Sequence, residues 1–375
     1  MMRLHCLPLL VILTACSSHI DAATNEPRPD DPNPSQHAIS ASSSVTLIPS
    51  NLPPDTCTTA GAGDLIVPRG TSVSLDPNAA CDAVVSQGPN LPAICVRKFA
   101  NVAIAGTLAI DTRTSSHDAV AIVATNAFQV SGRIDGRGRG DVRGTGGNAP
   151  EPGRAWSGAG AGHATPGAPG LDGDPPAAGG GAYATSRTDV ATGAAGGVGG
   201  VGLQTGAAGG RAGGALHIVA CHDLDLSGTL SVAGGNGERG GDGWAGNPVP
   251  ALGGGGGGGG SGGTLLVEAL HVLGSGAALS AIGGTGGTGG TAFLPTTTWP
   301  GGAGGAGGTG SHGPTVGENS NYVSEGPYQG ITGSGGGGGA SGRIAILVPT
   351  GTALPAVTSD PPATVGAATV QTASR

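Results

Sequence analysis

The stretch LHIVACHDLDLSGTLSVAGGNG, residues 216–237, contains the pattern that decides the fold. Its apolar residues alternate with polar or small ones, and a Ser-Gly pair at 227–228 interrupts the alternation. Period-two alternation over short runs, broken by Ser-Gly, predicts a strand, a turn and a second strand. Asp223 and Asp225 alternate with the apolar residues around them, so we expect both carboxylates to face outward.

The same pattern recurs along the chain without gaps. Residues 266–279 repeat residues 217–230 at an offset of 49, and residues 121–134 match them 96 positions upstream. Shorter copies occupy residues 102–110 and 342–348. Self-similarity of this kind is typical of stacked units. We therefore predict an all-β fold built from parallel β-helix or β-solenoid-like repeats, with the three longer copies as adjacent tiers. The alignment also predicts that His222 and His271 share one register, at a corner between two strands.

Long glycine-rich inserts separate the copies, at residues 136–213, 236–262 and 285–341. Parts of them have period three, as in GGTGGTGGT (283–291). An extended threefold helix makes no internal hydrogen bonds, and glycine leaves two of its edges as bare backbone. If neighbouring helices bond laterally, the inserts form a packed layer of polyglycine II type; otherwise they are disordered bristles. Buried backbone groups must pair but exposed ones need not, so both alternatives stay open, as does a broader polyglycine bundle bordered by strands.

Several motifs in this region resemble functional sites without meeting their requirements. The DxDxSG start of a calcium loop has Gly234 at the twelfth position, where a bidentate Glu is needed. The GxGxxG at 235–240 opens no helix, and the GxSxG around Ser261 follows glycines instead of a strand. His217, Cys221 and His222 could together ligate a transition metal. We favour instead a disulfide at Cys221 and surface imidazoles for the two histidines. We expect no metal site, no cofactor and no catalytic set.

The cysteines predict an oxidising compartment. Cys6 lies in the apolar leader, and Cys16 ends the sequence LTAC, which resembles the lipobox of bacterial lipoproteins. The remaining four cysteines allow three pairings. The SQGPNLPA sequence between Cys81 and Cys95 can turn back on itself, which favours that pair and leaves Cys57 with Cys221 by elimination.

The N-terminus predicts a secreted and anchored chain. Residues 1–15 have the pattern of a signal peptide, with an apolar run too short to span a membrane. The lipobox resemblance implies that Cys16 is lipidated, and Ser17 after it implies sorting to the outer membrane. Residues 16–56 are rich in Pro, Ser, Asn and Asp and predict a disordered tether. We assign residues 57–350 to the glycine-rich domain and 351–375 to a C-terminal tail.

Each insert carries one tryptophan, Trp156, Trp244 or Trp299. One hypothesis makes these indoles stacking platforms for sugars. The alternative, which we favour, is that each ring is buried against glycine backbone that has nothing else to pack against.

The charge balance restricts the possible partners. The chain has 24 acidic and 16 basic residues, and Lys98 is its one lysine. No basic patch is present to neutralise phosphates, so nucleic acid is not an expected partner.

Four motifs together resemble a group of glycine-rich surface lipoproteins of myxobacterial type: GDLIVPRGTSVSLD (63–76), GTLSVAGGNG (228–237), GGGGGSGGTLLVEA (256–269) and GGGGGASGRIAIL (335–347). The resemblance covers residues 57–350 and implies no reaction, so it transfers no catalytic residue.

We therefore expect a non-catalytic structural or adhesive lipoprotein of the cell envelope, with envelope polysaccharide or a neighbouring surface protein as partner. A carbohydrate-binding β-helix is the first alternative. Cleavage of the sugar would need acids and a basic residue on one face, for which the candidates are Asp223, Asp225, Glu238, Arg239 and Asp242. Calcium-assisted assembly is the second alternative, although Arg239 stands where the GGxGxD repeat requires Asp.

Overall fold

The computed structural model describes residues 45–76, 81–88, 91–110, 119–136, 156–171, 176–182, 186–200, 206–246, 250–309 and 312–372. They belong to one unit that begins at Ser44. Every regular element in these ranges is a β-strand. No helix in them is long and apolar enough to cross a membrane. The lipobox residue Cys16 and the signal peptide lie outside the described residues.

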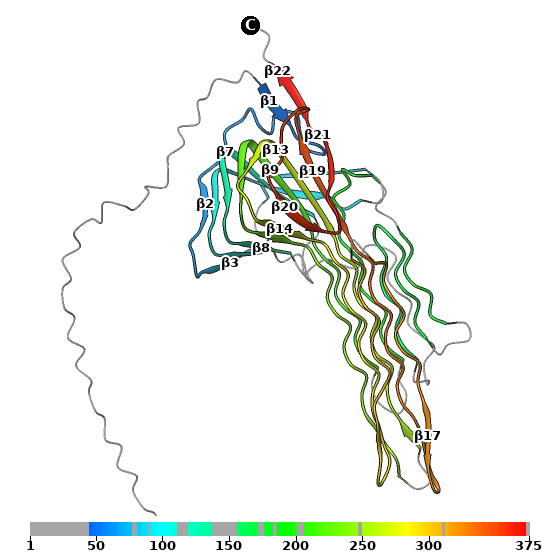
Figure 1. The fold of residues 1–375 in the computed structure, drawn as a ribbon. Helices are drawn as coiled ribbons and strands as arrows, with labels where there is room; N and C mark the ends of the chain where they lie inside the picture. The colour runs from blue at the N-terminus through cyan, green and yellow to red at the C-terminus, as the bar shows by residue number, and fades with distance from the viewer. Residues whose placement is uncertain are drawn as a thin grey trace, which may run out of the picture. The chain divides into compact units, whose positions relative to one another are not determined.

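Two mostly parallel sheets organise the unit (Figure 1). Strands of the first sheet are, in order, β2 (Asp64–Val67), β5 (Ile94–Ile104), β7 (Ala119–Val130), β9 (Ala215–Leu226), β13 (Thr264–Leu273), β19 (Arg343–Val348) and β21 (Thr364–Ala367), with β4 (Ala83–Val85) antiparallel to β5. Strands of the second sheet are β3 (Ser72–Leu75), β6 (Thr107–Ile110), β8 (Arg133–Asp135), β10 (Thr229–Ser231), β14 (Ala277–Ser280) and β20 (Val357–Asp360). Each pass of the chain thus adds one strand to each sheet, as expected of an all-β, β-helix-like arrangement.

The strand registers reproduce the offsets of the sequence repeat. His217 of β9 pairs with Ala121 of β7, 96 residues upstream, and with Leu266 of β13, 49 residues downstream. In the second sheet, Leu230 pairs with Ile134 and Leu279 at the same two offsets. The prediction that the three copies lie on neighbouring strands is therefore confirmed.

The predicted register of the two histidines is wrong. Between Ala269 and His271 the β13 strand has one residue, whereas β9 has two residues at that point, and the register shifts there. His271 consequently pairs with Asp223 instead of His222. Because the position is an irregularity inside two continuous strands, it is also not a break between strands.

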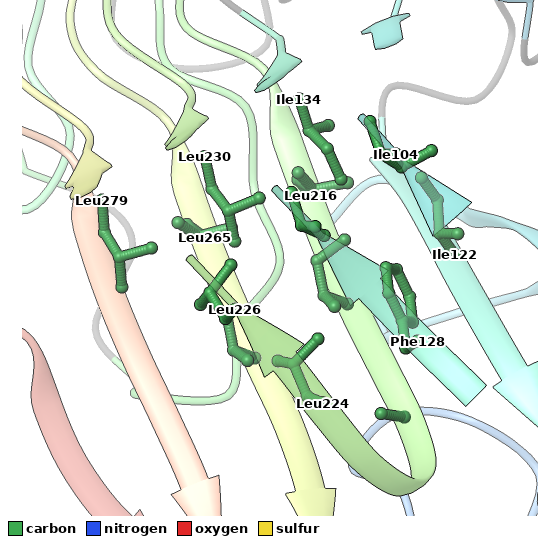
Figure 2. Packing of buried hydrophobic residues seen from close by; sticks show 14 of the residues in the cluster. Ile104, Ile122, Phe128, Ile134, Leu216, Leu224, Leu226, Leu230, Leu265 and Leu279 are labelled. Carbon is green, nitrogen blue, oxygen red and sulfur yellow. The ribbon is translucent and has the colours of Figure 1, made fainter. Parts of the chain in front are cut away.

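Stacked apolar side chains form the main core, which lies along one face of the long strands and the short strands (Figure 2). One ladder runs through Ile122, Ile218 and Val267, which are paired on β7, β9 and β13 and are fully buried. A second ladder in the short strands joins Leu108, Ile134, Leu230 and Leu279. Each side chain thus packs on its equivalents in the neighbouring tiers, which accounts for the repetition in sequence.

The first halves of the long strands are buried on both faces. Their outer face carries a second core to which Ala215, Val219 and Leu266 contribute. Leu47 and Leu52 cover it from the N-terminal segment 45–60, which we name the strap. Burial on both faces explains why these strand halves are continuous apolar runs instead of alternating ones.

The strap and the C-terminal segment correct two predicted boundaries. β1 (Val45–Ile48) pairs with β22 (Thr369–Thr372), and Leu47 is fully buried, so residues 45–56 are not part of a tether. β20, β21 and β22 are strands, so residues 357–372 are not a simple tail. Both segments lack glycine tracts and repeats, but their apolar residues complete the sheet edges and the outer core.

Both disulfides favoured by the sequence are present. Cys81 is bonded to Cys95 on β5, and Cys57 of the strap is bonded to Cys221 on β9. The second bond closes a sequence separation of 164 residues and fixes the strap on the outer core.

The described parts of the inserts form an ordered array of extended glycine helices. Figure 1 shows them running side by side between the sheets and a group of short strands. The run 253–263 is fully buried and lies at the centre. Its successive N–H groups donate in rotation to three neighbours; for example, Gly258, Gly259 and Gly260 donate to Gly197, Gly337 and Gly235. This rotation is the signature of a threefold helix that bonds laterally.

Six neighbours surround the central run. Segments 194–200, 232–241 and 331–340 accept its N–H groups, and segments 156–161, 207–213 and 284–290 donate to its carbonyls. Adjacent neighbours are also bonded to one another, as Gly237 to Thr285 and Gly337 to Gly158. The alternative of packed helices is thereby confirmed over disordered bristles for the described parts of the inserts.

The far ends of the helices carry two small sheets, which we name the tip. One sheet contains β11 (Gly243–Trp244), β15 (Ala292–Phe293) and β16 (Thr298–Trp299). The other contains β12 (Ala251–Leu252), β17 (Tyr322–Glu325) and β18 (Tyr328–Ile331). A small core of Ala251, Ala292, Leu294 and Val323 joins them. The central run returns from β12 to β13 at about 3.1 Å per residue, so roughly 30 Å of glycine helix separates the tip from the sheets.

A methyl group inside the array should destabilise it far more than one at its margin. A Cβ on Gly258 would lie 1.9 Å from the carbonyl oxygen of Ala159, whereas a Cβ on Gly246 would meet no atom within 4 Å. Overpacking typically costs about 1–3 kcal/mol, and a clash with backbone cannot relax by a rotamer change. We expect Gly258→Ala to lower the thermal unfolding midpoint by several degrees and Gly246→Ala to leave it unchanged, as measured by circular dichroism. Equal midpoints for the two variants would contradict the packed array.

Candidate functional site

The acidic motif on β9 forms cross-strand pairs. Asp223 Oδ1 lies 2.7 Å from His271 Nδ1 on β13, and Asp225 Oδ2 accepts a hydrogen bond of 3.1 Å from Gln129 Nε2 on β7. Both carboxylates are partly exposed, and their apolar neighbours on β9 are buried, which confirms their outward orientation. Each acid therefore bonds to a different neighbouring strand, so the two carboxylates join adjacent strands on the outer surface.

The candidate cleavage residues do not converge. Glu238, Arg239 and Asp242 belong to the helix that leads from β10 to the tip, whereas Asp223 and Asp225 lie on β9. Within the described ranges, no hydrogen bond or ion pair joins the two sets. Nor does any group of three or more His, Cys, Asp and Glu side chains in these ranges have an arrangement that could hold a metal ion.

Ser261 has a structural partner. It is fully buried in the central run, and its Oγ accepts a hydrogen bond of 2.8 Å from Ala194 N–H. Its own N–H donates to the Ala194 carbonyl. The hydroxyl thus continues the lateral bonding of the array.

A buried histidine–carboxylate pair lies under the strap. The expectation that His217 is a surface imidazole is wrong, because its side chain is fully buried, whereas His222 is exposed as expected. His217 on β9 and Glu268 on β13 face the outer core, and Nε2 lies 3.0 Å from Oε2 with both side chains fully buried. Ser50 N–H of the strap donates to the same Oε2 at 2.8 Å. Burial alone would raise the pKa of Glu268, but the hydrogen bonds from His217 and Ser50 outweigh burial and hold this pKa below its usual range.

The pair fastens the strap at an energetic cost. His217 Nδ1 and Glu268 Oε1 are buried and have no hydrogen-bond partner within the described ranges. Unsatisfied buried polar atoms cost about 1–3 kcal/mol each. The strap and the outer core seal the pair, and it is closer to a structural fastening than to a catalytic dyad, which must reach a substrate.

His163 is a second buried imidazole that sequence reasoning missed. Its Nε2 lies 3.3 Å from the Ala191 carbonyl oxygen and 3.3 Å from Thr264 Oγ1. Burial lowers its pKa to about 4, with Arg343 adding to the effect against the opposing hydrogen bond to Ala191. The ring is therefore neutral at neutral pH, and it joins the array to β13.

The tip gathers most of the chain's aromatic side chains. The sequence contains nine aromatic residues, and five of them lie on the tip strands: Trp244, Phe293, Trp299, Tyr322 and Tyr328. Trp244 is 67% exposed, Tyr322 65% and Trp299 44%. The preference for tryptophans buried on glycine is therefore wrong for Trp244 and Trp299, because their strands end the array and no further helix covers them.

Trp156 behaves differently from the other two tryptophans. Its ring is half-buried, and its carbonyl accepts a hydrogen bond from Gly200 within the array. Its helix, 156–161, lies on the opposite side of the central run from helix 232–241, which leads to Trp244. The three tryptophans hence do not form one platform.

Trp244 and Phe293 are placed together by the repeat. They are register partners on parallel strands, at the 49-residue offset. Their ring centroids are 4.2 Å apart and their planes differ by 9°, so the rings are stacked. Trp299 pairs with Ala292 instead, which puts it on the other face of the sheet, with its Nε1–H donating to Thr297 Oγ1 at 3.2 Å.

A polar cluster adjoins the stacked rings. Asp242 precedes Trp244 by two positions, and Thr291 precedes Phe293 by two positions. The Asp242 Oδ1 atom accepts a hydrogen bond of 2.8 Å from the Thr291 N–H. The Arg239 guanidinium binds the Asp242 carboxylate through both terminal nitrogens and donates to Thr291 Oγ1 at 2.7 Å. Burial would raise the pKa of Asp242, but these hydrogen bonds and the Arg239 charge lower it overall. The tip thus combines open aromatic faces with fixed, ionised hydrogen-bonding groups.

Comparison with protein-family models, curated proteins and solved structures found no match to this chain.

Replacing Glu268 tests whether the buried pair fastens the strap. Because its pKa is depressed in the folded state, its contribution to stability is full above the unfolded value near 4.5 and is lost as the pH falls through the folded value. We expect Glu268→Gln to lower the free energy of unfolding by about 1.5–3 kcal/mol at pH 7, which is the typical contribution of a hydrogen bond to a charged group. Denaturant unfolding at several pH values should show the difference from wild type shrinking below about pH 4.5. Glu238→Gln, at an exposed position, is the control, and a pH-independent deficit in Glu268→Gln would contradict this role.

Proposed function

We propose that the protein is a non-catalytic lipoprotein of the cell envelope with a structural or adhesive role. In this proposal the two parallel sheets form a β-solenoid, and the inserts form a polyglycine II-type bundle that presents the tip to a partner. The partner is an envelope polysaccharide or a neighbouring surface protein.

The observation that carries the proposal is the exposure of the tip aromatics at the ends of a hydrogen-bonded array. Trp244 and Tyr322 are each about two-thirds exposed, whereas most other large apolar side chains in the described ranges are buried or partly buried. Large exposed aromatics are costly to leave in water and are enriched where proteins bind their partners. The array holds these side chains away from the sheets through backbone bonds, which restricts their movement.

Two further observations support export and the lack of catalysis. The Cys57–Cys221 and Cys81–Cys95 disulfides are typical of chains that fold outside the cytoplasm. The acids considered for catalysis on β9 bond to side chains of neighbouring strands. We propose anchoring through a lipid on Cys16, with the outer membrane as location.

The anchor is tested by palmitate labelling in a Gram-negative host that expresses the full chain. We expect the wild-type chain to carry label in the membrane fraction and Cys16→Ala to lose both label and membrane association. Cys6→Ala, a cysteine within the predicted leader, should keep both. Membrane association that persists in Cys16→Ala would refute the anchor.

The adhesive role is tested with beads that are coated with the purified full chain. Outer-membrane vesicles are the probe, and the quantity measured is the amount of vesicle that the beads retain. We expect wild-type beads to retain vesicles several-fold better than beads carrying Trp244→Ala/Tyr322→Ala, because the variant removes the exposed rings. Trp156→Ala, on the far side of the array, serves as the control and should retain them. Equal retention by all three proteins would contradict the adhesive role of the tip. Treatment of the vesicles with periodate or with protease distinguishes a glycan partner from a protein partner.

A further inference from the structure

The geometry points to the open face of Trp244, backed by Phe293 and flanked by Arg239 and Asp242, as a binding platform for neutral glycans. The inference deepens the proposed function and rests on it, since it names the chemical class that the tip recognises. The ligand class is a neutral oligosaccharide or polysaccharide whose pyranose ring stacks on the indole.

The stacked pair is built to keep one aromatic face open. Phe293 covers one face of the Trp244 indole at 4.2 Å, yet the indole remains 67% exposed. Most of that exposed area must belong to the opposite face and the ring edge. Contact with Phe293 restricts the rotamers of Trp244 before any ligand arrives, which lowers the entropic cost of binding. A flat and fixed apolar face of this size suits the C–H face of a sugar ring.

The flanking polar groups suit the hydroxyls of the same sugar. Arg239 is half exposed and Asp242 about one-third exposed, so both are accessible on the segment that leads directly into Trp244. A guanidinium has five N–H donors in a fixed plane, and the contacts to Asp242 and Thr291 use three of them. The bidentate contact holds both groups in place, so that free N–H groups and a carboxylate lone pair remain for hydroxyls around a stacked ring.

Local charge favours a neutral glycan over an acidic one. Arg239 is paired with Asp242, and further carboxylates at or near the tip belong to Glu238, Glu318 and Glu325. Cations other than Arg239 are absent from the described parts of 236–246, 289–300 and 318–331. Uronates and phosphates would meet net negative charge there, whereas neutral hydroxyls would not.

The small size of the apolar surface argues against a protein partner. The sheet that carries the platform has three strands of two residues each, and its core side chains already pack on the second tip sheet. Stable protein–protein interfaces bury about 800 Å² on each partner. One open indole face with a polar margin matches a single sugar ring better than a second protein surface.

Tryptophan fluorescence titration of the full chain tests the inference. The probes are neutral hexasaccharides of glucose, mannose, galactose and N-acetylglucosamine, with oligogalacturonate as the acidic counterpart. We expect saturable quenching by at least one neutral probe and at least 10-fold weaker binding of the acidic one. By calorimetry, Trp244→Ala should bind the neutral probe at least 10-fold more weakly, Arg239→Gln several-fold more weakly, and Trp156→Ala like wild type.

Two measurements keep a negative result interpretable. The thermal midpoint of Trp244→Ala should match wild type, and Trp244→Phe, which keeps an aromatic face, should recover part of the affinity. No binding by any neutral probe, or preference for the acidic one, would overturn the inference. If vesicle retention still depends on the tip but is abolished by protease, the adhesive role stands and the glycan inference fails. Self-association in sedimentation that Trp244→Ala abolishes would instead identify a second copy as the occupant.

Discussion

The structure depends on a contact that only glycine permits, the approach of one helix backbone onto the carbonyl groups of another. At Gly258 the position of a Cβ is already occupied by a neighbouring carbonyl oxygen, at 1.9 Å. This closeness lets the central run bond to six neighbours at once. Ordering glycine is entropically costly, and little apolar area is buried here to offset that cost. Lateral hydrogen bonds between buried backbone groups must therefore supply most of the compensation, which makes the helices mutually dependent.

The strands determine where each glycine helix begins and thereby align the array. The offset of 49 residues that pairs β9 with β13 also pairs β10 with β14. It persists through the helices, where the Gly237 N–H reaches the carbonyl oxygen of Thr285, the residue directly before the 49-position equivalent Gly286. It reappears at the tip in the pair Trp244 and Phe293. The one-residue shift at His271 is therefore compensated before the second sheet begins. A register fixed by buried Leu and Ile is in this way transmitted to two aromatic rings at the tip.

The sequence predicted the features in which a residue type is compatible with only one environment, as an alternating apolar residue is with a buried strand face. Alternation and repetition predicted the tiers, because buried Leu230 needs an equivalent such as Leu279 beside it. Whether the inserts are ordered could not be decided from the sequence, because a glycine backbone forms hydrogen bonds equally well with water and with a neighbouring helix. Trp244 and Trp299 were misjudged because burial is the usual fate of an indole, and only the folded arrangement shows that their strands end the array. The His217–Glu268 pair escaped notice because its residues are 51 positions apart within apolar runs.

The same arrangement separates the chemically capable groups into two kinds. His217, Glu268 and His163 are buried and hold segments together, so their reactivity is unavailable to a large ligand. Arg239, Asp242 and Trp244 are accessible, and all three lie on one short segment at the tip. A glycine array has few side chains of its own, so a ligand meets little on its flanks to bind. Recognition is therefore restricted to the places where the period-three pattern stops and ordinary side chains resume. For this reason the loops that join the glycine helices, more than the helices, are where differences in sequence would change what is bound.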